Sequence, residues 1–370
     1  MPRRSSIVCA LVVLAFALVA FAEDHKIHQP TLTPQNSGTT NGLIAVSPVN
    51  SRVVWAAGRN GTFVVTTDGG KTWKAGVVAG AETLQFRDVQ GVSDKIAYLQ
   101  SISPTGTVPG EFRIYKTIDG GKSWTLEFQN QTVGAFYDCF AFWTPDRGIS
   151  HSDSVNGVFP DLRTTNGKTW KSISANMPPA LPGEASFAAS GTCVATQGFL
   201  NAWIATGGST SARILATRDG GNTWNAYDTP LVSNASAGAF TVAFRDPWHG
   251  IVGGGDLDPG DPNNARTAIS DDGGRKWKLT NPPPVTGAIY GLAYASDVGL
   301  LNNRHDWFGN DDDSRTVVVT ANDGGAAWTP DEGKTWYSLT GITGYWAVAF
   351  ADRQSGWLVG VNGTILKISF

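Results

Sequence analysis

The chain has 370 residues, among them 44 glycines, 14 tryptophans, three cysteines and two methionines. Its net charge of −3, without any dominant basic run, argues against a nucleic-acid-binding protein, so we expect no nucleic-acid partner. Short β-branched and aromatic runs alternate with Gly, Asn, Asp and Pro along the chain, and this pattern predicts an all-β protein.

The N-terminal segment has the pattern of an export signal. Arg3 and Arg4 precede an apolar run over residues 7–21, and Ala20-Phe21-Ala22 fits the small-x-small cleavage rule. We therefore expect a signal peptide over residues 1–22 and export to a periplasm or to the outside of the cell. The mature chain, residues 23–370, is then expected to carry no membrane span. A retained membrane anchor is the alternative.

One short motif recurs along the chain and sets its organisation. The first copy, Thr66 to Trp73, reads TTDGGKTW, and further copies begin at residues 117, 164, 217, 270 and 329. The motif has the composition of a hairpin turn. In a turn of this composition the Asp carboxylate accepts backbone N–H bonds, Gly supplies a positive φ, and Trp buries a large apolar face. We interpret these boxes as structural turns, with Asp68, Asp119, Asp219, Asp272 and Asp331 as the carboxylates and Trp73, Trp124, Trp170, Trp224, Trp277 and Trp336 as the aromatic residues.

The spacing of the boxes predicts the architecture. Intervals of 47 to 59 residues suit four-stranded blades, in which the box is the turn between the third and fourth strands. Six units are expected at about 42–78, 84–128, 134–174, 187–228, 239–280 and 288–340. A seventh unit has strands at 345–350, 356–360 and 364–369, and then the chain stops. We predict a seven-bladed β-propeller in which residues from the polar 23–40 segment supply the missing strand; a floppy lead-in is the alternative.

This strand order also assigns the loops to two faces. All boxes lie on one face, and the loops between the second and third strands and between successive blades lie on the other. We expect the long loops at 101–111, 177–186, 253–265 and 299–314 on the face opposite the boxes, where function would sit.

The first strand of each blade lines the central channel, and several polar or aromatic residues lie near its start. We take Arg87, Tyr137, Tyr290, Tyr345 and Trp346 as candidate binding residues. Asp88, Asp138 and Glu184 are weak candidates for a general acid and base, although they are more simply explained as caps of strand ends and ligands of channel water.

Three arginines share one position. Arg113, Arg213 and Arg266 each lie four residues before their box, at the start of the third strand. Together they are suited to hold a carboxylate, a sulfate or an acidic partner, because the guanidinium fork fits such groups. Ordinary solubilising charge is the alternative.

Cysteine and histidine give little sign of metal chemistry. Cys139 and Cys193 fall at matching positions of neighbouring blades, so that a disulfide and two buried thiols are equally plausible. No zinc spacing, P-loop, dinucleotide fingerprint or GxSxG is present, so we expect neither a metal nor a cofactor. We expect a monomer.

The boxes resemble the Asp-box, or BNR, repeats of sialidases, xyloglucanases and sortilin-type receptors. The full repeat, as in VVWAAGRNGTFVVTTDGGKTW and GWLVGVNGTILKI, is similar to the seven-bladed photosystem II assembly and stability factors and their relatives. That resemblance covers residues 41–370 and implies an exported scaffold that binds a protein partner. The alternative is a glycoside hydrolase acting on a glycan at the channel mouth. Phe112-Arg113-Ile114-Tyr115 is similar to the FRIP motif of sialidases, with Tyr in the place of Pro, but neither their arginine triad nor their Tyr/Glu pair can be assigned.

Overall fold

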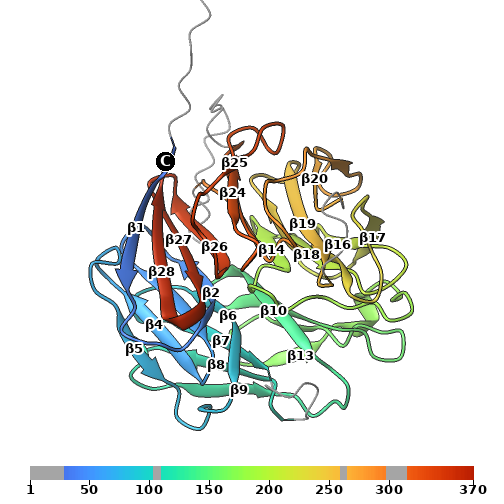
Figure 1. The fold of residues 1–370 in the computed structure, drawn as a ribbon. Helices are drawn as coiled ribbons and strands as arrows, with labels where there is room; N and C mark the ends of the chain where they lie inside the picture. The colour runs from blue at the N-terminus through green and yellow to red at the C-terminus, as the bar shows by residue number, and fades with distance from the viewer. Residues whose placement is uncertain (1–28, 103–109, 259–264, 297–314) are drawn as a thin grey trace, which may run out of the picture.

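The computed structural model describes residues 29–102, 110–258, 265–296 and 315–370. The expected signal peptide, residues 1–22, lies outside the described residues. Seven antiparallel sheets of four strands each are arranged around a common centre (Figure 1). The all-β, seven-bladed fold predicted from the spacing of the boxes is therefore confirmed.

The first three blades contain β2 (Leu43–Pro48), β3 (Val54–Gly58), β4 (Thr62–Thr66) and β5 (Lys74–Val77); β6 (Gln85–Gly91), β7 (Ala97–Ile102), β8 (Arg113–Thr117) and β9 (Thr125–Gln129); and β10 (Tyr137–Thr144), β11 (Arg147–Ser152), β12 (Leu162–Thr164) and β13 (Trp170–Ser172). The next three contain β14 (Val194–Gln197), β15 (Asn201–Thr206), β16 (Arg213–Thr217) and β17 (Asn225–Asp228); β18 (Ala237–Phe244), β19 (Gly250–Asp256), β20 (Thr267–Ser270) and β21 (Lys278–Leu279); and β22 (Gly291–Tyr294), β23 (Val317–Thr320), β24 (Ala326–Thr329) and β25 (Tyr337–Ser338). The seventh blade contains β26 (Tyr345–Asp352), β27 (Ser355–Gly360), β28 (Thr364–Ser369) and β1 (Thr31–Asn36), and two short 3₁₀ turns are η1 (Ser174–Asn176) and η3 (Val361–Gly363).

The ring is closed by the N-terminal strand. β1 pairs antiparallel with β28, from Thr31 opposite Ser369 to Asn36 opposite Thr364 (Figure 1). Gln35 in β1 accepts hydrogen bonds at Oε1 from Trp73 Nε1 at 3.1 Å and from Trp357 Nε1 at 3.2 Å. Because Trp73 belongs to the first blade and Trp357 to the last, this one side chain joins both ends of the ring.

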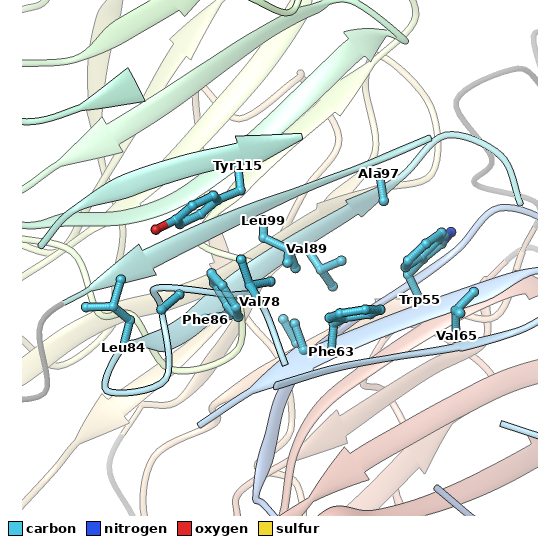
Figure 2. Packing of buried hydrophobic residues seen from close by; sticks show 13 residues of the cluster. Trp55, Phe63, Val65, Val78, Leu84, Phe86, Val89, Ala97, Leu99 and Tyr115 are labelled. Atoms are coloured by element: carbon cyan, nitrogen blue, oxygen red, sulfur yellow. The ribbon is translucent and has the colours of Figure 1, made fainter. Parts of the chain in front are cut away.

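The hydrophobic core lies between the blades. Figure 2 shows the contact of the first two blades, where Trp55 and Phe63 of the first meet Phe86 and Val89 of the second. The Trp55 indole also donates from Nε1 to the Ser93 carbonyl at 2.8 Å. Similar clusters fill the other six contacts between neighbouring blades, so each blade is stabilised by both of its neighbours.

The boxes form closed turns that use their own polar groups. In the first box Thr66 Oγ1 donates to Asp68 Oδ1 at 2.8 Å, and the same Asp68 carboxylate accepts from the amide and the hydroxyl of Thr72 at 2.9 and 2.6 Å. These donors, led by the Thr72 hydroxyl, lower the pKa of Asp68 to about 2. Gly69 and Gly70 have φ values of 77° and 85°, a conformation that favours glycine. The box carboxylates are thus committed to holding the turn.

The strands that flank one predicted loop differ from those expected. The segment 299–314 lies outside the described residues, but it connects β22 to β23, the first and second strands of the sixth blade. A connection between the first and second strands begins and ends on the box face, because the first strand of a blade runs toward that face and the second runs away from it. The sequence reading failed here because the first strand, Gly291–Tyr294, is only four residues long.

A disulfide joins the third blade to the fourth. Cys139 in β10 and Cys193 just before β14 are bonded, with their Cα atoms 5.9 Å apart and a separation of 54 positions in sequence. Both residues are fully buried. Of the two alternatives that the sequence left open, the structure contains the bridge.

Candidate functional site

The channel mouth opposite the boxes carries an arginine–aromatic stack. Tyr290 and Trp346 stack with their ring centroids 5.4 Å apart, and the Arg87 guanidinium carbon lies 5.8 Å from the centroid of the Trp346 ring. All three side chains are half-buried. Tyr290 directly precedes the first strand of the sixth blade, and Trp346 and Arg87 lie near the starts of the first strands of the seventh and second blades. The ring therefore brings together residues that are far apart in sequence.

Further aromatic and charged groups surround this stack. Phe240 lies beside Tyr290 at a centroid distance of 6.2 Å and stacks on Phe187 at 3.8 Å. Burial, followed by the charge of Arg59, lowers the pKa of Arg87 to about 10, and the charge of Asp138 opposes this shift. The guanidinium group of Arg87 suits a ligand that carries a carboxylate.

The channel below the stack is crossed by the chain itself. Residues 187–192, here the crossing segment, precede β14 and contact blades other than their own. Arg87 Nη1 donates to the Ala188 carbonyl at 2.7 Å, and Ser190 Oγ donates to the Tyr290 carbonyl at 2.6 Å. Gly191 has a φ of 74°, and a Cβ there would lie 2.6 Å from Asp88 Oδ1. The second, fourth and sixth blades therefore meet inside the channel, which occludes its centre.

A pair of carboxyl groups lies beside Arg87. Asp138 in β10 is fully buried, and neither of its carboxyl oxygens has an N–H or O–H donor among the described residues. Burial, together with the charge and hydrogen bond of the neighbouring Asp153 carboxyl, holds the pKa of Asp138 well above its ordinary value. Asp153 accepts from the Ser186 amide at 2.8 Å, and burial raises its pKa to about 6. The raised pKa values mean that this pair of carboxyl groups shares a proton and holds it to a higher pH than two separate aspartates would.

This shared proton predicts how stability depends on pH. A carboxyl whose pKa is higher in the folded than in the unfolded chain stabilises the fold fully below the unfolded value, near 4, and this stability is lost as pH rises through the folded value. For Asp153 the loss falls between about pH 4 and pH 6, and the raised pKa of Asp138 adds a loss in the same direction as pH rises. Asp138→Asn keeps a hydrogen-bond donor toward Asp153 without a proton to lose. We expect this variant to gain stability relative to the wild type as pH rises, measured by urea unfolding at pH 4.5, 6 and 8. A constant difference across these three conditions would contradict the shared proton.

The comparisons with known proteins agree on architecture. Residues 64–75, which contain the first box, match the family model of the BNR/Asp-box repeat. The protein is a seven-bladed propeller built on Asp-box repeats. No sequence among the curated proteins matches the chain.

Solved structures share this fold at low sequence identity. The Asp-box propeller is similar to the structure of YCF48 bound to D1 peptide, with a TM-score of 0.58 and 15% identity, over 92% of this chain and 97% of that chain. It is also similar to YCF48 from Cyanidioschyzon merolae, with a TM-score of 0.60 and 16% identity, over 91% and 98% of the two chains. The WD40 propeller domain of Doa1 aligns with a TM-score of 0.54 and 12% identity, over 91% and 95%. Identities this low establish the fold alone.

The candidate carboxylates of the Asp-box propeller do not converge on an open cleft. Asp88 is buried and accepts from the amides of Val89 and Phe140 at 2.7 and 2.8 Å, so it links the second blade to the third. Glu184 is buried and forms an ion pair with Arg213. A glycosidase needs two carboxyl groups facing each other across a space that admits substrate. Asp88 and Glu184 instead bind groups of the protein itself, and Asp138 pairs with Asp153.

The three arginines at the start of the third strands hold loops in place. Arg113 donates to the carbonyls of Gly110 and Gly80 at 2.8 and 3.1 Å. Arg266 is buried and donates from Nη1 to the carbonyls of Val285 and Gly287 at 2.7 and 2.9 Å. Together with Arg213, which binds Glu184 and the Pro179 carbonyl, they fasten inter-blade loops to the sheets. This arrangement favours an architectural role over a shared anion site.

Two of the candidate tyrosines lie in the core between blades. Tyr137 is buried, stacks on Phe112 at a centroid distance of 4.0 Å, and donates from its hydroxyl to the Pro160 carbonyl at 2.9 Å. Tyr345 is half-buried and packs with the core cluster of the sixth and seventh blades. The register of β26 against β27 shifts between Tyr345 and Ala347, so that Trp346 lies in a β-bulge, a feature that re-aims side chains.

The structure also adds residues that the sequence reading missed. Asp153 follows the second strand of the third blade, and Phe187 lies in the crossing segment; neither position repeats a feature of the other blades. His151 and Asp161 form a fully buried pair, with His151 Nδ1 2.9 Å from Asp161 Oδ2.

Among the described residues no cluster of His, Cys, Asp and Glu is arranged to hold a metal ion. In the same part of the chain, no helix is long and apolar enough to cross a membrane.

Proposed function

We propose that the protein is an exported propeller that binds a segment of a protein partner at the channel mouth opposite the Asp boxes. The observation that supports this is the half-buried stack of Arg87, Tyr290 and Trp346, seated on a channel that the crossing segment fills. Arginine, tyrosine and tryptophan are the residues that contribute most to protein interfaces, because they combine a large contact area with few rotatable bonds. A filled channel also provides a rigid base for such a surface.

The chemistry of the mouth specifies the class of segment. The Arg87 guanidinium favours a carboxylate, and the exposed parts of Tyr290 and Trp346 favour an aromatic or aliphatic side chain beside it. The proposal is therefore a peptide segment that carries an acidic and an apolar residue close together. The fold similarity to YCF48 bound to D1 peptide supports a peptide as the ligand, because a propeller of this shape accommodates one.

Export is part of the same proposal. It is supported by the signal-like N-terminal sequence and by the disulfide between Cys139 and Cys193, because such bridges form and persist in oxidising compartments. A periplasm or the extracellular space meets this condition.

A peptide selection tests the proposed function directly. Random peptides displayed on phage are selected on the immobilised wild-type protein, and the enriched sequences are then synthesised and titrated by calorimetry. We expect Trp346→Ala to weaken their binding by about 30-fold, which corresponds to about 2 kcal/mol for a residue at the centre of an interface. Trp346→Phe, which keeps an aromatic ring, is expected to retain most of the affinity.

Two controls make the outcome interpretable. Ile118→Ser changes an exposed apolar residue in the second box, on the opposite face, and should leave binding unchanged. Equal affinity for wild type and Trp346→Ala, or no enrichment of any sequence, would contradict the proposal. Hydrolysis of a chromogenic glycoside that is lost in Asp138→Asn would instead support the glycosidase alternative.

A further inference from the structure

The outer hairpin of the third blade, formed by β12 and β13 and here called the charged hairpin, carries two cations opposite each other. Arg163 in β12 is the register partner of Lys171 in β13. Residues that lie directly opposite each other project on the same face of the sheet, and like charges in such a pair are destabilising. The equivalent pairs in the other six blades contain at most one cation: Val65 with Lys74, Lys116 with Thr125, Ala216 with Asn225, Ile269 with Lys278, Trp328 with Tyr337, and Lys367 with Thr33. The fold therefore does not require this pair of charges.

The two cations line a pocket of about 370 Å³, which the charged hairpin and the residue after it form by themselves. Thr165, Asn166 and Thr169 from the turn, and Ser172 and Ile173 from its C-terminal end, complete the lining. All of these side chains except that of Ile173 contain a hydrogen-bond donor. Among the described residues that line the pocket, none carries a negative charge, so the lining has two positive charges and many donors.

The turn of the charged hairpin lacks the carboxylate that the other five boxes contain. Asn166 takes the place of the aspartate, and its Oδ1 accepts from the amides of Lys168 and Thr169 at 3.0 and 2.9 Å and from Thr169 Oγ1 at 3.1 Å. An amide oxygen therefore holds this turn as the Asp68 carboxylate holds the first box, but without the negative charge. The exchange removes from the motif the group that would repel an anion.

Neither cation is neutralised by the protein. Arg163 donates from Nη1 to the Gly220 carbonyl at 3.0 Å and to Asn222 Oδ1 at 2.9 Å, and these contacts fix the guanidinium against the fourth box. In the described part of the chain, its other N–H groups and the Lys171 ammonium have no protein acceptor, and neither side chain forms an ion pair. Arg163 is therefore held in position while several of its donors remain available to a ligand.

The carboxylates of adjoining segments are engaged by other groups. Asp161, two residues before Arg163, is fully buried and pairs with His151 at 2.9 Å. Asp219 in the fourth box accepts from the amide and the hydroxyl of Thr223 at 3.0 and 2.6 Å. These two acidic residues hold the protein's own structure, and neither lines the pocket.

Four further charged groups interact near the second blade. Burial lowers the pKa of Lys116, the charges of Glu127 and Asp146 oppose this shift, and the charge of Lys168 adds to it. The two carboxylates and two ammonium groups sum to no net charge, and none of the four residues lines the pocket. The positive charge of the pocket is thus set by its own two cations.

We propose that the charged hairpin binds a tetrahedral oxyanion, a phosphate or a sulfate group, between Arg163 and Lys171. The guanidinium can donate two parallel hydrogen bonds from Nε and Nη2, and the ammonium supplies the second positive charge. The Asn166 amide and the Thr165 hydroxyl can donate to the remaining oxygen atoms. A bound anion also offsets the repulsion between the two cations. The pocket volume falls in the range of small-molecule sites, so the group can belong to a free ion or to an ester.

This site is separate from the one proposed for the peptide segment. The charged hairpin turns at the third box, whereas Arg87, Tyr290 and Trp346 lie at the channel mouth on the opposite face. The two binding activities can therefore be measured independently, and the failure of one would leave the other standing.

Calorimetric titration tests the proposal. The chain from residue 23 onward, which contains all seven blades, is titrated with sodium phosphate, sodium sulfate and glycerol 2-phosphate at an ionic strength held constant with sodium chloride. We expect one equivalent to bind with a Kd on the order of 1 mM, the strength of a few charge-assisted hydrogen bonds at a partly exposed site. Preference for the inorganic ions would assign the site to free phosphate or sulfate, and tighter binding of glycerol 2-phosphate would assign it to an ester.

Two variants and a matched control locate the binding. Lys171→Gln removes one positive charge and should weaken binding about tenfold. Asn166→Asp restores the aspartate of the other five boxes, so the turn should form, but the added negative charge should weaken binding at least as much. Lys278→Gln changes an exposed lysine at the same position of the fifth blade, opposite Ile269, and should bind like the wild type.

Urea unfolding in sodium chloride establishes which variants fold. If Asn166→Asp does not fold, Lys171→Gln and its control decide the question between them. Absence of saturable binding by the wild type, unchanged binding by either folded variant, or an equal loss in Lys278→Gln would each overturn the proposal.

Discussion

Replacing Glu184 with alanine should lower the free energy of unfolding by about 3–5 kcal/mol, because the change leaves a largely buried cation without its partner. The Arg213 side chain is only 11% exposed, and its Nε donates to Glu184 Oε1 at 2.8 Å. Glu184 also accepts from the Leu181 amide at 2.7 Å and from Thr206 Oγ1 at 2.7 Å. One carboxylate thus joins the loop that enters the fourth blade to two of its strands.

A double substitution separates the loss of the charge pair from the loss of packing. Glu184→Leu with Arg213→Met removes both charges and keeps side chains of similar size, so most of the lost stability should return. Urea unfolding of the wild type, the single variant and the double variant at one pH measures both effects. If the free energy of unfolding of Glu184→Ala lies within about 1 kcal/mol of the wild-type value, the pair behaves like an exposed salt bridge and the prediction is wrong.

The architecture could be predicted from the sequence because its determinants are local and repeated. Each box needs only its own hydroxyl, carboxylate and glycines to form, as the hydrogen bonds around Asp68 show. The regular interval between boxes then fixes the size of a blade and, through the truncated last unit, the need for a strand from the other end of the chain. Strand β1 supplies it.

The candidate site was less predictable because its residues depart from the repeat. The spacing of the boxes predicts that the fourth unit begins at about residue 187, but its first strand, β14, begins only at Val194. Residues 187–192 instead cross the channel, held by acceptors in other blades such as the Tyr290 carbonyl. No periodic pattern marks such a segment. No periodic pattern marks Asp153 either, because it lies just after the end of β11, outside the repeated strand positions.

Repetition also explains why a shared position does not give a shared ligand. Arg113, Arg213 and Arg266 occupy equivalent places in three blades, at the start of the third strand. Their partners, however, lie in loops whose lengths and sequences differ, so each guanidinium finds different carbonyls or, for Arg213, a carboxylate. Equivalent positions in a repeat establish equivalent backbone geometry, and the surrounding loops decide what each side chain contacts.

Removing the disulfide should cost about 4 kcal/mol of stability, and this is the effect that most directly bears on export. A bridge between residues 54 positions apart restricts the unfolded chain, and the loop-closure estimate for that separation is about 4 kcal/mol. Cys139→Ala with Cys193→Ala in the chain from residue 23 onward should therefore unfold at a lower urea concentration than the wild type. A strong reductant present throughout unfolding and refolding should bring the wild type close to the variant.

Both sulfur atoms belong to fully buried residues, so the bridge should resist reduction in the native protein and react only after local opening. A thiol count on the denatured, unreduced chain from residue 23 onward should find no free cysteine, since the two cysteines of that chain pair with each other. Two free thiols in protein recovered from an oxidising compartment, or equal stability of wild type and variant without reductant, would contradict the prediction. The variant should still bind the selected peptides at temperatures where it stays folded, because both cysteines of the bridge are fully buried.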